Sequence, residues 1–147
     1  MATRGQAGSI REYRLLHTRC EYKGNLISVM LLVLNNGSCP AGDFLASLTP
    51  QERRKVDVLF ELIGCRGRIS NREHFKKIEG TDLFEFKRHQ VRLICFYTDD
   101  KQIVICHALR KKKDRHKRRD LEFATELRNS YLKLCAGDKS HERQKPE

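Results

Sequence analysis

The chain has 147 residues, which is long enough to bury one hydrophobic core and short for two domains. Thirty lysines and arginines against nineteen aspartates and glutamates give a formal net charge of +11, which favours a polyanionic partner such as RNA or DNA. Residues 1–25 lack the apolar centre of a signal peptide, and the apolar run Leu26–Leu34 is about half the length needed to span a bilayer. We therefore expect a cytoplasmic protein without a membrane segment.

The six cysteines do not form a recognisable metal or disulfide pattern. They contain no CxxC pair, and no histidine joins them at zinc-finger spacing. Cys95 and Cys106 lie inside strand patterns, where a thiol behaves as a small hydrophobe. The cysteines are therefore expected to be reduced and mostly in the core, with no metal site.

The N-terminal part of the chain predicts an extension followed by a strand and a short helix. Residues 1–24 show little pattern and are interpreted as an N-terminal extension. Leu26–Leu34 reads as a strand buried on both faces, and Asn35-Asn36-Gly37 is a turn signal that ends it. Pro40 suits the first position of a short helix. We expect one domain over residues 25–135, and a disordered tail over residues 136–147.

A second helix is predicted to begin at Thr49. Thr49 can cap it, Pro50 takes the first helical position, and Glu52 can close a capping box. Apolar residues follow at helical spacing and indicate a face that covers a sheet: Val56, Leu59, Phe60 and Ile63. Gly64 is the expected end of this helix. The polar residues 65–76 are expected to form a loop.

Three strands are predicted next, over residues 83–87, 91–98 and 102–109. Asp99-Asp100 is interpreted as the tight turn between the last two. If this loop has two residues, Arg92 lies opposite His107, and directly opposed residues share a face of the sheet. A slip of one residue would separate them.

Arg92 and the segment that follows the third strand suggest a nucleic-acid site. Arg92 lies inside an apolar strand, where an unpaired charge is costly and an anionic partner such as phosphate would satisfy it. Residues 110–119 then carry eight lysines and arginines before a C-terminal helix that begins near Leu121. Positive charge at a helix N-terminus is unfavourable by roughly a few tenths of a kcal/mol per residue, so a polyanion is expected to compensate. The alternative interpretation of residues 110–119 is a solvated basic face or a flexible linker that binds no polyanion.

Three segments in this order resemble the RelE/HigB superfamily of toxins from type II toxin–antitoxin systems, in its HigB-like, phage-derived branch. They are CPAGDFLASLTPQERRKV, HFKKIEGTDLFEFK and VRLICFYTDDKQIVICHALRKKKDRHKRRDLE. The resemblance covers about Val29 to Leu132. It implies an α+β fold of compact, RelE-like form: two N-terminal helices packed on a twisted, mainly antiparallel sheet, and a C-terminal helix.

The resemblance also implies an activity. Such toxins cleave mRNA in the ribosomal A site, by attack of the RNA 2′-hydroxyl on the adjacent phosphate, without a metal or a cofactor. The implied partners are the ribosome, its mRNA and a cognate antitoxin, of helix-turn-helix, HigA-like type. The chain would be an endoribonuclease that inhibits translation.

The matching positions imply roles for individual residues. Arg92 takes the position of the phosphate-binding arginine, and Lys111 and Lys112 match the paired lysines that stabilise charge. His107 is the proton-transfer candidate, and Glu85 lies where several relatives carry an acidic base. RNA or ribosome binding is assigned to the remaining basic residues of the segment: Arg110, Lys113, Arg115, His116, Lys117, Arg118 and Arg119.

Other interpretations of these residues remain open. Arg92 could form a structural ion pair with Glu85 or an aspartate, His107 could cap the core, and Glu85 could be a surface carboxylate. His116 replaces a threonine of the family pattern and is a second acid–base candidate, although a solvated loop histidine is the plainer interpretation. Tyr131, expected to face the core, cannot replace the tyrosine that some relatives carry near the chain end.

Two other functions remain compatible with the sequence. One is a non-enzymatic inhibitor of the same fold, such as the ParE-type proteins associated with DNA gyrase. The other is an inactive, phage-derived nucleic-acid-binding protein.

Overall fold

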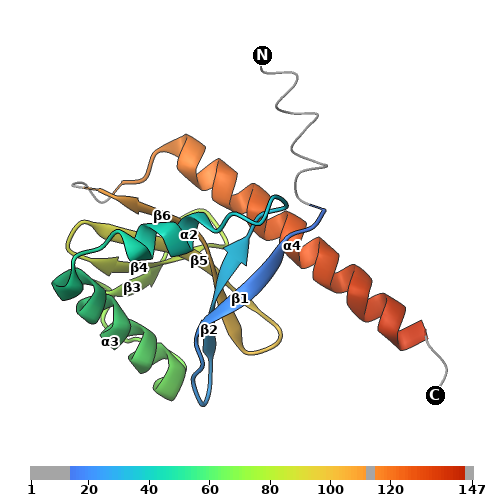
Figure 1. Cartoon of the computed structure of the whole chain (residues 1–147), viewed down its shortest axis with the longest axis horizontal. Coiled ribbons are helices and arrows are strands. Elements are labelled where there is room, and N and C mark those ends of the chain that lie inside the picture. Colours follow the sequence, from blue (N-terminus) through green and yellow to red (C-terminus); the bar gives the residue numbers. More distant parts are fainter. Residues whose placement is uncertain (1–13, 112–114, 145–147) are drawn as a thin grey trace.

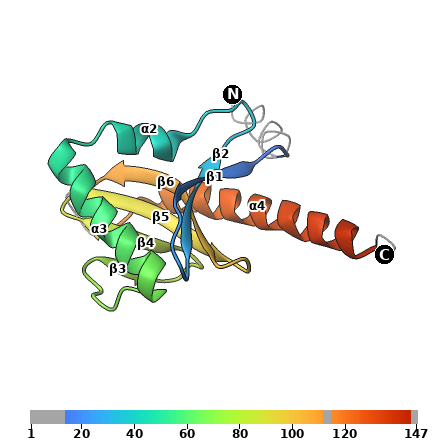
Figure 2. The same ribbon diagram turned by 60° about the horizontal axis from the view of Figure 1, so that its bottom comes forward.

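The computed structural model describes residues 14–111 and 115–144, with side chains described to residue 137. In this part of the chain one sheet lies between two layers of helices, with α2 and α3 on one face and α4 on the other (Figures 1 and 2). The elements in chain order are β1 (His17–Tyr22), β2 (Ser28–Val33), α2 (Pro40–Ala46), α3 (Pro50–Arg66), β3 (Phe75–Lys77), β4 (Phe84–Arg88), β5 (Val91–Thr98), β6 (Gln102–Arg110) and α4 (Arg118–Gln144).

The sheet has six strands in the order β1-β2-β6-β5-β4-β3. Only β2 and β6 pair in parallel, and the other neighbouring strands of the described sheet are antiparallel. The expected α+β class is therefore confirmed, with two N-terminal helices on a mainly antiparallel sheet and a C-terminal helix, consistent with a compact RelE-like fold.

Both edge strands were missed by the sequence analysis. Residues 17–22, placed there in an N-terminal extension, form β1, and β3 lies at the end of the expected loop 65–76. The sequence of β1, HTRCEY, is polar because an edge strand leaves much of its length exposed. A polar strand has no apolar alternation from which it could be detected.

Alternation along the central strands builds a core on each face of the sheet. In β5, Leu93 and Cys95 pack with α2 and α3, whereas Ile94 and Phe96 pack with Ala124 of α4. Strands covered on both faces read as continuous apolar runs, as in residues 91–98. The apolar length of β5 follows from this double burial.

The capping box of α3 is confirmed. The backbone N–H of Glu52 donates to Thr49 Oγ1 at 3.1 Å, and that of Thr49 donates to Glu52 Oε1 at 3.0 Å. The predicted end at Gly64 is wrong, because the helix continues to Arg66 and Gly67 closes it in the left-handed conformation with φ 79°. Gly64 is needed for packing instead, since a Cβ there would lie 2.5 Å from Tyr22 Cε2.

The predicted two-residue turn between β5 and β6 is also wrong. Thr98 pairs with Gln102, so the loop has three residues and ends at Lys101 with φ 59°. A bulge at Cys106 then shifts the register once more, which places Arg92 opposite Leu109 and His107 opposite Ile94. The expected direct pairing of Arg92 with His107 therefore does not occur.

The C-terminal helix is longer than expected, because α4 continues past residue 136, where a disordered tail was predicted, to Gln144. Tyr131 packs on this side of the core near Phe96, as predicted. None of the helices in the described part of the chain is both long and apolar enough to cross a membrane.

All six thiols are unbonded, and only Cys39, Cys95 and Cys106 are buried, so the expectation that most lie in the core holds for half of them. Burial raises the pKa of Cys106 to about 12.

Candidate functional site

Three predicted site residues of the sheet, Glu85, Arg92 and His107, share the face that α4 covers. Glu85, Ile94 and His107 form one cross-strand row, and Arg92 lies in the next row, opposite Lys87 and Leu109. Directly paired residues point to the same face, and Ile94 belongs to the core under α4. The bulge at Cys106 keeps His107 on this face although the register has shifted.

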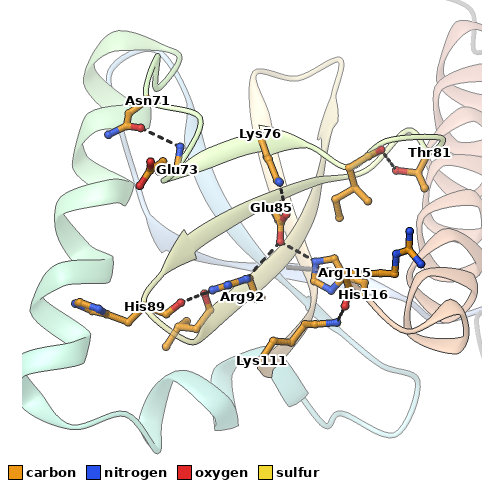
Figure 3. Close-up of polar contacts among 12 residues, drawn as sticks. Asn71, Glu73, Lys76, Thr81, Glu85, His89, Arg92, Lys111, Arg115 and His116 are labelled. Atoms are coloured by element: carbon orange, nitrogen blue, oxygen red, sulfur yellow. Dashed lines mark hydrogen bonds and ion pairs between the residues drawn. The ribbon is translucent and has the colours of Figure 1, made fainter. Parts of the chain in front are cut away.

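Glu85 is the centre of a buried polar network between the sheet and the segment that enters α4 (Figure 3). It is 1% exposed, and its Oε1 accepts a hydrogen bond from His116 Nε2 at 2.7 Å. Arg92 Nε lies 3.9 Å from the same oxygen, and Lys76 Nζ lies 4.0 Å from Oε2. A buried carboxylate requires such countercharges. The surface carboxylate considered from the sequence is therefore excluded by the structure.

His116 is buried rather than solvated, with 8% of its surface exposed. Because Nε2 carries the proton donated to Glu85, the ring joins the segment before α4 to β4. Its Nδ1 is buried, with no hydrogen-bond partner among the described residues. The plainer interpretation of His116 as a solvated loop residue is wrong.

Arg92 is 4% exposed and is held by backbone as well as by charge. Its Nη1 donates to the carbonyl oxygens of Val91, at 3.0 Å, and of His89 (Figure 3). The ion pair with Glu85 that the sequence left open is present at 3.9 Å. Arg92 is thus oriented toward the β4–β5 turn.

His107 forms a second histidine–carboxylate pair, with Asp120 in the first turn of α4. The two are joined at 3.1 Å between Nε2 and Oδ1, and the ring lies edge-on to Phe123 with centroids 5.5 Å apart. The His107 side chain is 22% exposed, in contrast to His116. Asp120 was missed because its proximity to His107 depends on how α4 docks on the sheet.

Lys111 lies between these two pairs. Its backbone N–H donates to Gln90 O at 2.7 Å, and its ammonium donates to the carbonyl oxygen of Arg115. Burial lowers the pKa of Lys111, and Arg92 and Lys117 lower it further, whereas Asp120 and Glu85 oppose the change. An amine of lowered pKa releases its proton more readily than an ordinary lysine.

The remaining basic residues do not gather at one point. Arg110 faces the two N-terminal helices: its guanidinium donates to both carboxylate oxygens of Glu52, in the first turn of α3, at 2.8 and 2.9 Å, and lies 5.9 Å from the Phe44 ring of α2. Arg118 pairs with Glu122 on the exposed side of α4, and Arg119 is exposed. Lys112 and Lys113 lie outside the described residues.

Two grooves divide the predicted site. The first, here called the His107 groove, has a volume of about 700 Å³ and is lined by His107, Leu109, Arg110, Lys111, Arg115, His116, Lys117 and Asp120. The second, the His74 groove, has a volume of about 650 Å³ and is lined by Arg72, Glu73, His74, Lys76, Lys87, Arg88, His89 and Arg92. Since His116 lines the first and Arg92 the second, buried Glu85 connects the two. Lys76 and Lys87 were missed because only strand pairing brings them to Glu85 and Arg92.

The groups along the His107 groove suit proton transfer and charge stabilisation. A partly exposed His–Asp pair can accept or donate a proton, and Lys111 can stabilise or protonate an oxyanion. Within the described residues, no group of three or more His, Cys, Asp or Glu side chains is arranged to hold a metal ion.

Comparison with known proteins gives one family match. Residues 43–129 match the family described as phage derived protein Gp49-like (DUF891), and this range is more than half of the chain. A search of curated proteins found no match. The matched range runs from α2 into α4 and includes both grooves, and this chain therefore belongs to the Gp49-like family of phage-derived proteins, within the RelE/HigB-like toxin superfamily of toxin–antitoxin systems.

Proposed function

We propose that this protein is the toxin of a type II toxin–antitoxin system and acts as a ribosome-dependent mRNA endoribonuclease in the cytoplasm. The observation that carries the proposal is the His107 groove, where a His–Asp pair and Lys111 face one space beside the Arg92–Glu85 pair. Membership of a toxin superfamily supports the same conclusion and implies a cognate antitoxin. We propose an antitoxin of helix-turn-helix, HigA-like type that covers the His107 and His74 grooves.

The reaction needs only groups that the chain provides. The 2′-oxygen of the RNA attacks the adjacent phosphorus, and the bond from phosphorus to the 5′-oxygen breaks. One proton leaves the 2′-hydroxyl and another reaches the departing 5′-oxygen, which yields a 2′,3′-cyclic phosphate and a 5′-hydroxyl. Positioned acid–base groups and fixed positive charge accelerate such a transfer.

The geometry supports a division of roles among the candidates. His107, oriented by Asp120, transfers protons, and Lys111 stabilises the phosphorane or protonates the leaving oxygen. Arg92 contributes positive charge at the boundary of the two grooves. Glu85, which is enclosed by His116, Arg92 and Lys76, suits a positioning role better than the base role implied by the resemblance.

The burial of Arg92 favours a second candidate function. A guanidinium that is already hydrogen-bonded to two backbone carbonyls and faces Glu85 is not presented to a phosphate as an open fork. If Arg92 is structural, the basic grooves would serve binding alone. The protein would then be a non-enzymatic inhibitor, such as one directed at DNA gyrase, or an inactive nucleic-acid-binding protein.

Primer extension on mRNA from translating ribosomes tests the proposal. The full chain is added beside His107→Ala, Arg92→Lys and a matched control, His17→Ala, which removes an exposed histidine from β1. We expect cuts at A-site codons, and none on free mRNA. His107→Ala should slow cleavage by about 10²-fold or more, as expected for the loss of an acid–base group, whereas His17→Ala should cleave as the wild type does.

The opposite results separate the two candidate functions. If the wild type produces no cuts but still arrests growth, the nuclease proposal fails and a binding inhibitor takes its place. If His107→Ala cuts as fast as the wild type, the protein is a nuclease whose proton-transfer group lies elsewhere.

A further inference from the structure

Apart from Arg92, the His74 groove is a strongly basic surface that the catalytic assignment does not use. Lysine, arginine and histidine supply seven of its eight lining side chains, and Glu73 is the only acid among them. A neighbouring groove of about 580 Å³ shares His74 and is lined by Leu62, Arg66, Arg68, Ile69, Ser70, Asn71 and His74. The two form one basic path from the end of α3 to the β4–β5 turn.

Hydrogen bonds to histidines orient the cations of this path. Arg88 Nη1 donates to His74 Nε2 at 2.8 Å, and Lys55 Nζ donates to His89 Nε2 at 3.2 Å. Both histidines therefore accept from a cation and do not neutralise it. Among the described residues, neither Arg72 nor Arg88 forms an ion pair with a carboxylate. Positive charge on Arg72 and Arg88 thus remains available for an anionic ligand.

The lining indicates which part of a polyanion would bind. No aliphatic side chain and no Phe, Tyr or Trp lines the His74 groove, so its lining is mostly polar and its only rings are the imidazoles of His74 and His89. Arginine and lysine side chains in a mostly polar lining typically contact phosphates. The path follows the irregular segment between α3 and β3, where Asn71 turns the chain by accepting the amide N–H of Glu73 at 2.9 Å (Figure 3).

The path is adjacent to the candidate catalytic groove. Arg92 lines the His74 groove and faces Glu85, whose hydrogen-bond donor His116 lines the His107 groove. The amide N–H of Lys111 donates to Gln90 O in the β4–β5 turn, which ties the ends of the two grooves together. The two grooves could thereby be followed by one continuous strand of a polyanion.

We propose that the His74 groove binds the phosphodiester backbone of RNA, at phosphates other than the one that is cleaved, through Arg72 and Arg88. The inference rests on the proposed function, because it takes RNA as the substrate. The groove provides affinity that does not depend on base sequence and holds the message beside the His107 groove.

Fluorescence anisotropy with a labelled 2′-O-methyl RNA oligonucleotide tests the groove, since this RNA cannot undergo 2′-oxygen attack. Binding is measured for the full chain between about 50 and 200 mM KCl, where contacts to single-stranded phosphates each contribute about 0.7 to the logarithmic salt slope. Arg72→Gln/Arg88→Gln should flatten the slope by about 1.4. The control Arg14→Gln/Lys23→Gln removes the same charge from exposed positions beside β1, at the opposite edge of the sheet, and should leave the slope close to that of the wild type.

A variant that should bind RNA more tightly serves as a control for misfolding, because a misfolded protein would not gain affinity. Glu73→Gln removes the only acid that lines the groove and should tighten RNA binding severalfold. Asp99→Asn, at the far end of β5, makes the same change of charge and should have a smaller effect.

The outcomes distinguish this inference from the proposed function. If Arg72→Gln/Arg88→Gln and its control give the same salt slope, and Glu73→Gln binds no more tightly than Asp99→Asn, the groove inference is overturned even if the wild type cleaves mRNA on ribosomes. If the groove variants behave as expected while the wild type produces no cleavage, RNA binding by the groove is supported and the nuclease proposal alone fails.

Discussion

Glu85 is the side chain on which the buried polar network depends. Its carboxylate faces a histidine, an arginine and a lysine from three different segments of the chain. Removal of one partner from a buried charged group usually costs more than the intact pair contributes, because the remaining charges are left without compensation. The network therefore fixes how the segment before α4 lies on the sheet.

Glu85→Gln should lower the free energy of unfolding by about 3 kcal/mol, because it keeps the shape of the side chain but leaves Arg92 without its countercharge. Urea unfolding followed by circular dichroism measures the change. Glu122→Gln is the matched control: it removes an exposed partner of Arg118 and should cost less than about 1 kcal/mol. Equal costs for the two variants would show that the Glu85 network does not stabilise the fold.

At the scale of single elements, α3 contains a glycine that resembles a helix end in the sequence but is required by packing inside the helix. Gly64 resembles a helix end in the sequence, yet it lies inside α3 where the chain around Gly24 passes close to the helix backbone. The amide N–H of Leu26 donates to Gly64 O at 2.8 Å at this crossing. Close approach, rather than a left-handed conformation, is the reason for glycine at this position.

Gly64→Ala and Gly137→Ala should change stability in opposite directions. At Gly64 the new Cβ would lie 2.5 Å from Tyr22 Cε2 and 3.0 Å from Gly24 Cα, so overpacking of about 1–3 kcal/mol should outweigh the helix propensity of alanine. At Gly137 in α4 nothing lies within 4 Å, and alanine should stabilise by up to about 1 kcal/mol. Thermal unfolding measures both, and stabilisation by Gly64→Ala would contradict the close packing described here.

In the β5–β6 hairpin, two shifts of the strand register cancel in their effect on which face of the sheet His107 takes. The three-residue loop shifts the register by one position, and the bulge at Cys106 shifts it by one more. Because side chains alternate with a period of two, the two shifts together return His107 to the face of Arg92. The candidate site depends on this bulge.

At the scale of the whole molecule, Glu52 joins elements that are far apart in the sequence. Its carboxylate caps α3 through Thr49 and accepts two hydrogen bonds from Arg110 at the end of β6. The helix layer of α3 is thereby attached to the strand that leads into the His107 groove. This attachment is exposed to solvent, so salt should weaken it.

The stability of the protein should fall in acid through Glu52. The hydrogen bond from Arg110, followed by that from the Thr49 backbone, lowers the pKa of Glu52 from 4.5 to about 2. A carboxylate whose pKa is lowered by folding stabilises the native state above the unfolded pKa, and this contribution is lost as the pH falls through the folded value. The stability difference between wild type and Glu52→Gln should be full above about pH 5 and shrink toward pH 2.

Urea unfolding at several pH values measures this difference, and Arg110→Ala supplies the partner variant. In a double-mutant cycle the two substitutions should be non-additive at pH 6 and become more nearly additive toward pH 2, where Glu52 is partly protonated. A difference that does not change with pH would exclude Glu52 as a source of acid sensitivity.

Local signals were sufficient for much of the fold. The start of α3 at Pro50 follows from side chains within four residues of each other, and β5 begins and ends where its apolar run does. The polar strand β1 carries no comparable signal, and the residues of α4 beyond 136 have no apolar pattern from which a helix could be predicted. Elements without a strong local preference are decided by pairing and docking.

The candidate site could be predicted only as a set of positions. A charged residue inside an apolar strand identified Arg92, and the resemblance to RelE/HigB toxins identified His107, Lys111 and Glu85. Asp120, Lys76 and Lys87 could not be found in this way, because each meets its partner only through the docking of α4 or the pairing of strands.

The sequence by itself determined the capped helix, the apolar strands and the excess of positive charge, because these depend on residues close together in the chain, and its resemblance to a known superfamily implied the α+β class. Tertiary structure alone decided that Glu85 and His116 are buried partners, that the Arg110 guanidinium pairs with Glu52, and that two grooves rather than one contain the basic residues. The physical reason is that burial and ion pairing depend on which distant segments meet. A register shift of one residue or the docking of one helix changes every such contact.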